Sequence, residues 1–178
     1  MLGDSLTIDD YERLPHALAR NHELIDGELV EESGKTLREH LLRGHLTSLL
    51  ADHVGAHRLG LVISGQAYDF NGNAYGPDVS FFRASKRPLV EMKLRVQPFV
   101  PDLAIEIVSA DDTLEMLVQK AQRYRACGTQ DVWIFSVETR QVLLFSEHRR
   151  VILDENDEFH PETIPGFAIR IGELLDRY

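Results

Sequence analysis

The stretch Pro101-Asp-Leu-Ala-Ile-Glu-Ile-Val-Ser109 decides the fold prediction. Residues 103–108 form a short run of Leu, Ala, Ile and Val between turn residues, which is typical of a β-strand. Glu106 interrupts this run, and an ionised carboxylate among apolar side chains is costly unless it is paired or binds a metal. The alternative is that Glu106 lies on the solvent side of an edge strand and alternates with buried neighbours.

Further strands are predicted on both sides of this segment. Four other runs rich in Val, Ile and Phe have strand character, at residues 61–70, 78–82, 132–137 and 142–145. A turn at 71–76 separates the first two runs. Near the N-terminus, Asp26-Gly27 stands between the two short alternating halves of 22–30, which predicts a tight β-hairpin.

Helices are predicted where capping patterns precede amphipathic stretches. Capping boxes begin at Thr7 and Thr36. The first predicts a short N-terminal helix, and the second predicts a helix over about 37–57. A third amphipathic helix is expected from 112 or 113 to about 126, with Tyr124 on its apolar face and Gly128 just beyond its end.

The element order predicts an α/β (α+β) protein in which a central mixed β-sheet is flanked by helices. The order is helix, hairpin, helix, three strands, helix and two strands, which differs from alternating βαβ winding. The apolar periodicity runs from about Leu6 to Leu175 without a repeat or a linker. Residues 1–178 are therefore expected to form a single domain, in keeping with roughly 150 residues per domain.

The composition excludes several classes of protein. The 178 residues include 29 acidic and 19 basic side chains, and the net charge of −10 argues against a bulk basic surface for nucleic acid. No apolar run approaches the ~18 residues of a membrane helix, and the start of the chain lacks a signal-peptide pattern. The single Cys127 cannot form an internal disulfide. These features predict a cytoplasmic protein that acts away from membranes.

Two carboxylates on neighbouring strands form the candidate site. Asp78 begins the strand before 103–108, and adjacent strands lie about 4.8 Å apart, so a suitable register brings Asp78 beside Glu106. Asp102 lies roughly 13 Å along the strand from Glu106, too far to share one ion. Lys120 lies at the edge of the apolar stripe of its helix, so it is either an ordinary surface lysine or carries its ammonium to the carboxylates.

Seven segments carry a family resemblance, at residues 6–14, 22–30, 39–40, 77–81, 101–109, 120–124 and 128–134. The Asp, Glu and Lys residues resemble the PD-(D/E)xK nuclease superfamily. The chain as a whole is similar to the Uma2-like family of restriction endonucleases, also known as DUF820. The resemblance extends over about residues 6–145, and the ordered set of segments is more specific than any one Pro-Asp pair.

The resemblance implies a restriction-endonuclease-like fold and a metal-dependent endonuclease, a hydrolase that cleaves phosphodiester bonds of nucleic acid, with DNA expected. Asp78 and Glu106 would be catalytic metal ligands, with the backbone carbonyl of Ile107 as a third ligand and Mg²⁺ or Mn²⁺ as the cofactor. The superfamily pattern places its lysine two residues after the acidic residue, where this chain has Val108. The catalytic lysine is therefore expected at Lys120 instead.

Two more residues match the family near this site. Glu23 in the hairpin is expected either to add a carboxylate on the metal side or to face solvent, and His40 is expected to be adjacent to the site. Between Phe82 and Pro101, a basic loop is either a set of phosphate contacts or a solvated surface. Its basic residues are Arg83, Lys86, Arg87, Lys93 and Arg95.

Other polar residues are assigned no chemistry. His53 and His57 have i, i+4 spacing, but two histidines leave a zinc site incomplete, so buried or interface histidines are expected. Ser109 and Cys127 have no base nearby in the sequence, which argues against nucleophilic catalysis.

The acidic charge also supports an alternative function. A chain without a DNA-reading motif could keep a nuclease fold as a catalytically inactive module for binding or assembly. In either case a homo-oligomer, most simply a dimer, is expected, because C₂ symmetry is the commonest assembly and cutting two strands benefits from two sites.

Overall fold

The centre of the molecule is a six-stranded mixed sheet. The computed structural model describes residues 5–32 and 34–176, and the strand order of this sheet is β11-β10-β9-β8-β6-β3. The strands are β3 (Gly60–Ser64), β6 (Val79–Arg83), β8 (Leu103–Ile107), β9 (Asp131–Ser136), β10 (Gln141–Phe145) and β11 (Arg150–Leu153). The predicted strand at 103–108 is therefore central, paired in parallel with β9 and in antiparallel with β6. The edge-strand alternative for Glu106 is wrong.

A second sheet, of five strands, has the order β2-β1-β5-β4-β7. Its members are β1 (His22–Ile25), β2 (Glu28–Glu31), β4 (Ala67–Phe70), β5 (Asn73–Tyr75) and β7 (Val96–Gln97). The predicted hairpin is confirmed, because β1 and β2 pair in antiparallel around Asp26 and Gly27. Both turn residues have positive φ, 51° and 82°, as a two-residue hairpin turn of this kind requires.

Five α-helices and one 3₁₀ helix are present among the described residues. They are α1 (Ile8–Arg13), α2 (His16–Ala19), α3 (Leu37–Ala56), η1 (Ala84–Leu89), α4 (Leu114–Ala126) and α5 (Ile171–Leu175). The capping boxes at Thr7 and Thr36 are confirmed, and the Thr113 side chain caps α4. None of the helices in the described part of the chain is both long and apolar enough to cross a membrane.

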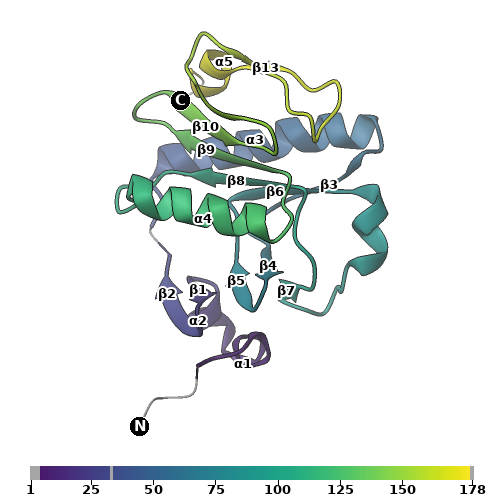
Figure 1. The fold of residues 1–178 in the computed structure, drawn as a ribbon, viewed down its shortest axis with the longest axis vertical. Helices are drawn as coiled ribbons and strands as arrows, with labels where there is room; N and C mark the ends of the chain where they lie inside the picture. Colours follow the sequence, from purple (N-terminus) through teal and green to yellow (C-terminus); the bar gives the residue numbers. More distant parts are fainter. Residues whose placement is uncertain (1–4, 33, 177–178) are drawn as a thin grey trace.

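Helices α3 and α4 cover opposite faces of the central sheet (Figure 1). The alternation along β8 directs Leu103, Ile105 and Ile107 into the core that contains the α3 leucines. Ala104 instead belongs to the core that contains Leu117, Ala121 and Tyr124 of α4. Glu106, two positions from Ala104, therefore lies on the α4 face. The predicted class, a mixed sheet flanked by helices, is confirmed.

The segment 61–70, predicted as one strand, is two strands in different sheets. Gly65, with φ of +65°, turns the chain between β3 in the central sheet and β4 in the second sheet. The predicted turn at 71–76 is also shorter than expected, because β5 occupies part of it. The turn itself lies at Asn71-Gly72, where both residues have positive φ.

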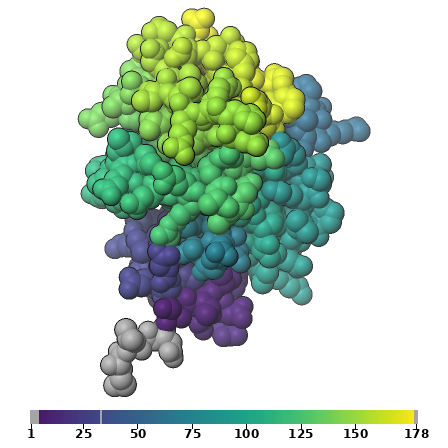
Figure 2. All heavy atoms as spheres, viewed as in Figure 1, coloured from purple at the N-terminus to yellow at the C-terminus, as the bar shows by residue number. Residues whose placement is uncertain are grey.

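The C-terminal elements were not predicted. Beyond β10 the chain adds β11, β12 (Glu158–Phe159), β13 (Ile169–Arg170) and α5. Phe159, Ile164 and Ile171 from this region join the α3 core. In the space-filling view the C-terminal residues lie at the opposite end of the molecule from the N-terminal helices (Figure 2).

Candidate active site

The predicted carboxylates lie side by side, Asp78 directly before β6 and Glu106 on β8. These strands pair with Val79 opposite Ile105, and the same register continued by one residue brings Asp78 opposite Glu106. Both residues are nearly buried, with 5% and 7% of their surface exposed. Asp78 Oδ2 accepts a hydrogen bond of 2.8 Å from the backbone N–H of Ile107, which fixes its carboxylate across the two strands.

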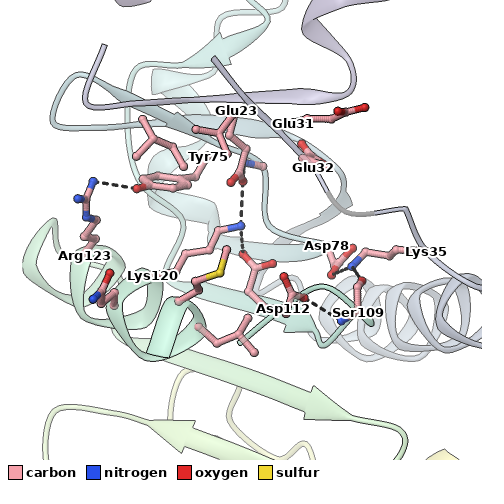
Figure 3. Close-up of a pocket in the computed structure, with 17 residues that line it drawn as sticks. Glu23, Glu31, Glu32, Lys35, Tyr75, Asp78, Ser109, Asp112, Lys120 and Arg123 are labelled. Atoms are coloured by element: carbon pink, nitrogen blue, oxygen red, sulfur yellow. Dashed lines mark hydrogen bonds and ion pairs between the residues drawn. The ribbon is translucent and has the colours of Figure 1, made fainter. Parts of the chain in front are cut away.

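Lys120 reaches the same point from α4. Its Nζ lies 2.9 Å from Glu23 Oε1 and 3.3 Å from Glu106 Oε1, so the ammonium bridges two carboxylates (Figure 3). Burial acts to lower the pKa of Lys120, but the charges of Glu106 and Glu23 outweigh it and raise this pKa above its ordinary value. Lys120 therefore stays protonated and can act as a donor rather than a base.

Glu23 is directed into the site by the β1–β2 hairpin. Its Oε1 accepts the Lys120 bond and also a 3.1 Å hydrogen bond from the backbone N–H of Gly76. The side chain is buried, so the alternative in which Glu23 faces solvent is wrong. The hairpin, the sheet and α4 thus meet at one point.

Tyr124 also contacts the pair, although sequence reasoning identified it only as part of an apolar helix face. Its hydroxyl donates a 2.7 Å hydrogen bond to Glu106 Oε1. Burial raises the pKa of the Glu106 carboxyl above its ordinary value, while the charge of Lys120 and the Tyr124 bond act in the opposite direction. Glu106 is thus a buried carboxylate held by one cation and one hydroxyl.

Lys35 is the residue that sequence reasoning missed entirely. Its Nζ lies 2.9 Å from Asp78 Oδ2 and donates a 3.1 Å hydrogen bond to Ser109 Oγ (Figure 3). It also donates a 3.0 Å hydrogen bond to the Ile107 carbonyl. Lys35 precedes a helix cap and belongs to no apolar pattern, so no sequence signal marks it. The Ile107 carbonyl, expected as a metal ligand, accepts a bond from this ammonium.

A cavity of about 210 Å³ is lined by Glu23, Lys35, Asp78, Glu106 and Lys120, among others. Its charged residues are six acidic and three basic: Glu23, Glu31, Glu32, Asp78, Glu106 and Asp112, with Lys35, Lys120 and Arg123. Burial and the nearby Glu23 charge raise the pKa of Glu32. The described residues contain no group of three or more His, Cys, Asp or Glu placed to hold a metal ion.

Two other predicted residues lie outside the cavity. His40 is exposed, and its Nδ1 lies 3.2 Å from Arg43 Nη2, while Arg43 Nη1 lies 3.8 Å from Asp78 Oδ1. His40 therefore reaches the site only through Arg43. Asp102 forms ion pairs of 3.2 Å with Arg83 and 3.0 Å with Lys86, away from the site.

The basic segment 83–95 does not line this cavity. Arg83 and Lys86 bind Asp102, Arg87 binds the Gly60 carbonyl, and Arg95 binds backbone carbonyls of the N-terminal helical region. Contacts of this segment with substrate phosphates therefore stay a prediction, and would lie outside the cavity. Instead of an irregular loop, the stretch between Phe82 and Pro101 contains η1 and β7.

The histidine pair at the C-terminal end of α3 also binds backbone. The rings of His53 and His57 lie 4.3 Å apart, and each bonds a backbone carbonyl, that of Pro165 for His53 and that of His53 for His57. His53 is half-buried and His57 is exposed, so the expectation of buried histidines is wrong, and an interface role for the pair stays a prediction.

Comparison with known proteins identifies the family. The Uma2 family model, described as "Putative restriction endonuclease", matches residues 8–172. The chain belongs to the Uma2 family. The Uma2 resemblance predicted from the sequence is thus confirmed, and no curated protein matches the chain.

The Uma2 chain also shares its fold with solved structures, of which five chains match. One is the crystal structure of a "putative nuclease belonging to DUF820" from Anabaena variabilis ATCC 29413. It superposes with a TM-score of 0.84 at 20% sequence identity, covering 96% of this chain and 98% of that one. At this identity the similarity establishes the fold alone.

Proposed function

We propose that this Uma2 chain is a Mg²⁺-dependent endonuclease that hydrolyses phosphodiester bonds of nucleic acid, with DNA as the expected substrate. The observation that carries the proposal is the convergence of Asp78, Glu106 and Lys120 in one cavity, from two strands and a helix. Membership of a family described as a restriction endonuclease supports the same reaction class.

The donor atoms fit Mg²⁺ or Mn²⁺. Asp78, Glu106 and the Ile107 carbonyl offer only oxygen, the ligand that hard cations prefer. Mg²⁺ commonly keeps several waters and takes only one or two carboxylates from the protein, so two acidic ligands suffice. When bound, the ion would supply Lewis-acid chemistry by polarising a phosphate oxygen and neutralising negative charge.

The protein side chains would supply positioning and a fixed positive charge. Lys120 is protonated and held between Glu23 and Glu106, so its ammonium is oriented before a substrate arrives. An ammonium in this position can hold the attacking water and offset the charge that develops on phosphate. Glu23 would be a positioning residue, because it acts on the substrate only through Lys120.

Calorimetric titration of Mn²⁺ into wild type, Asp78→Asn and Glu106→Gln tests the metal site. We expect wild type to bind Mn²⁺ and each variant to lose at least tenfold in affinity, since removing one of two carboxylate ligands costs more than about 1.4 kcal/mol. Cleavage of labelled single- and double-stranded DNA in Mg²⁺ should fall at least 100-fold in both variants.

Asp102→Asn is the matched control. Asp102 is also a buried carboxylate paired with two cations, but at a different place on the sheet. This variant should bind Mn²⁺ like wild type. Full Mg²⁺-dependent cleavage by Asp78→Asn or Glu106→Gln would refute the proposal. Light scattering of the same samples tests the expected dimer.

A second candidate function is supported by the charges in the cavity. Both predicted ligands already contact an ammonium, Asp78 with Lys35 and Glu106 with Lys120, as in a site that serves only to hold the fold together. In that case the chain would be a binding or assembly module without catalysis. Wild type that takes up no Mn²⁺ at millimolar concentration and cleaves neither form of DNA would favour this function.

A further inference from the structure

The ammonium of Lys35 lies inside the site rather than in solvent. Its three donors match three oxygen atoms, one each from Asp78, Ile107 and Ser109, at 2.9, 3.0 and 3.1 Å. Only 16% of the Lys35 side chain is exposed. A lysine at a protein surface usually keeps its ammonium in water, so this position calls for an explanation.

Two of these three oxygens belong to the proposed metal ligands. The Asp78 carboxylate and the Ile107 carbonyl are the groups that would hold the divalent ion, and both bind Lys35. An ammonium and a divalent ion repel each other strongly at such close range. While Lys35 stays in place, the lone pairs directed at its ammonium are not available to a divalent ion.

We propose that Lys35 is an internal competitor for the divalent cation, occupying its position in the metal-free protein and leaving when the metal binds. This inference rests on the proposed function, because it concerns the regulation of the same metal site. Lys35 lies in the irregular segment before α3, next to the cap residue Thr36. Its side chain can therefore leave without unwinding a helix.

A variant of Arg43 distinguishes two effects: the loss of a positive charge near Asp78, and the loss of an ammonium that occupies the cation site. Its Nη1 lies 3.8 Å from the other oxygen of Asp78, and 32% of its side chain is exposed. Neutralising Arg43 removes one positive charge near Asp78 but vacates none of the Lys35 contacts. It is therefore the matched control for Lys35.

The first test is Mn²⁺ titration by calorimetry of wild type, Lys35→Met, Lys35→Ala and Arg43→Met. Both Lys35 variants should bind Mn²⁺ at least tenfold more tightly than wild type, because the competing state has been removed. Arg43→Met should differ from wild type by less than about threefold, as expected for a partly exposed charge. Circular dichroism checks that every variant is folded.

The second test follows Lys35 itself in the wild-type protein. An amine-acylating reagent, read out by mass spectrometry, should modify Lys35 slowly in EDTA and at least tenfold faster in saturating Mg²⁺. The exposed Lys93 serves as the internal reference, and its rate should not change.

The outcomes separate this inference from the proposed function. Wild type that binds Mn²⁺ while the Lys35 variants bind it equally or more weakly would overturn the competition and leave the metal site intact. The same holds if Arg43→Met tightens binding as much as Lys35→Ala does, or if Mg²⁺ leaves Lys35 acylation unchanged. If even Lys35→Ala binds no Mn²⁺, the metal site itself is refuted, and the competition with it.

Discussion

At the scale of single residues, Glu106 is a carboxylate that lies within a buried strand. All five residues of β8 are buried, and a carboxylate there loses most of its hydration. Lys120 and Tyr124 compensate with a charge at 3.3 Å and a hydroxyl at 2.7 Å on the same oxygen. The buried carboxylate of β8 is thus stabilised by two side chains of another element, α4.

The Tyr124 bond leads to a pH-dependent prediction. Burial raises the pKa of Glu106 in the folded protein above its ordinary value of 4.5, so the free energy of unfolding falls as the pH rises through that raised pKa. Tyr124→Phe removes a bond that favours the ionised form. We expect it to cost about 1 kcal/mol at low pH, where Glu106 is protonated, and roughly 2–3 kcal/mol once Glu106 is ionised.

Tyr68→Phe is the control for this prediction. The Tyr68 hydroxyl also makes a buried 2.7 Å hydrogen bond, but its partner is the uncharged hydroxyl of Ser80. Burial raises the pKa of Tyr68 to about 12, so it stays neutral over the range used. Denaturant unfolding between about pH 5 and pH 9 should give a constant cost for Tyr68→Phe. An equally constant cost for Tyr124→Phe would contradict the account of Glu106.

The candidate site was predictable only in part. Asp78 and Glu106 follow from strand spacing, because side chains opposite each other on adjacent strands share a face. Lys35 comes from an irregular segment, and its position depends on how α3 joins the sheet, which no local pattern encodes. Tyr124 was predicted correctly on the apolar face of its helix, but its hydroxyl partner is a tertiary contact.

At the scale of elements, the sequence is clearest where a local signal fixes the backbone. Capping boxes and the Asp26-Gly27 turn gave correct boundaries because their hydrogen bonds lie within a few residues. The segment 61–70 was misassigned because its strand-like composition continues past Gly65. The chain changes sheets there because β3 pairs with β6 while β4 pairs with β5, and the composition of the segment does not distinguish these two partners.

Substitution of two glycines by alanine should change the free energy of unfolding in opposite directions. Gly44 lies exposed within α3, and a Cβ there would meet no atom within 4 Å. Gly44→Ala should therefore raise the free energy of unfolding by about 0.5–1 kcal/mol, since alanine loses less backbone entropy in a helix.

Gly60→Ala should have the opposite sign. A Cβ at Gly60 would lie 2.0 Å from the Phe82 carbonyl oxygen on β6, so the β3–β6 pairing would have to shift. We expect a loss of about 1–3 kcal/mol or more. Denaturant unfolding measures both variants. Equal effects of the two substitutions would show that close backbone contact at Gly60 does not limit the sheet.

At the scale of the whole molecule, the net charge opposes the proposed substrate. The chain carries −10, and the cavity has six acidic groups against three basic ones. Polyanionic nucleic acid would be repelled by this surface without a cation. A divalent ion in the site would reverse the local sign where the phosphate must lie.

Nucleic-acid binding should therefore require a divalent cation. Ca²⁺ prefers oxygen ligands, so we expect it to bind at the carboxylates and to tighten the binding of a labelled DNA oligonucleotide at least tenfold over EDTA, measured by fluorescence anisotropy. Asp78→Asn should lose this gain.

Because only Lys35, Lys120 and Arg123 among the described residues of the cavity are basic, at most three phosphates can be neutralised directly. The slope of log K against log salt should then be no steeper than about −3. Equally tight binding in EDTA, or a much steeper slope, would place nucleic acid on another surface.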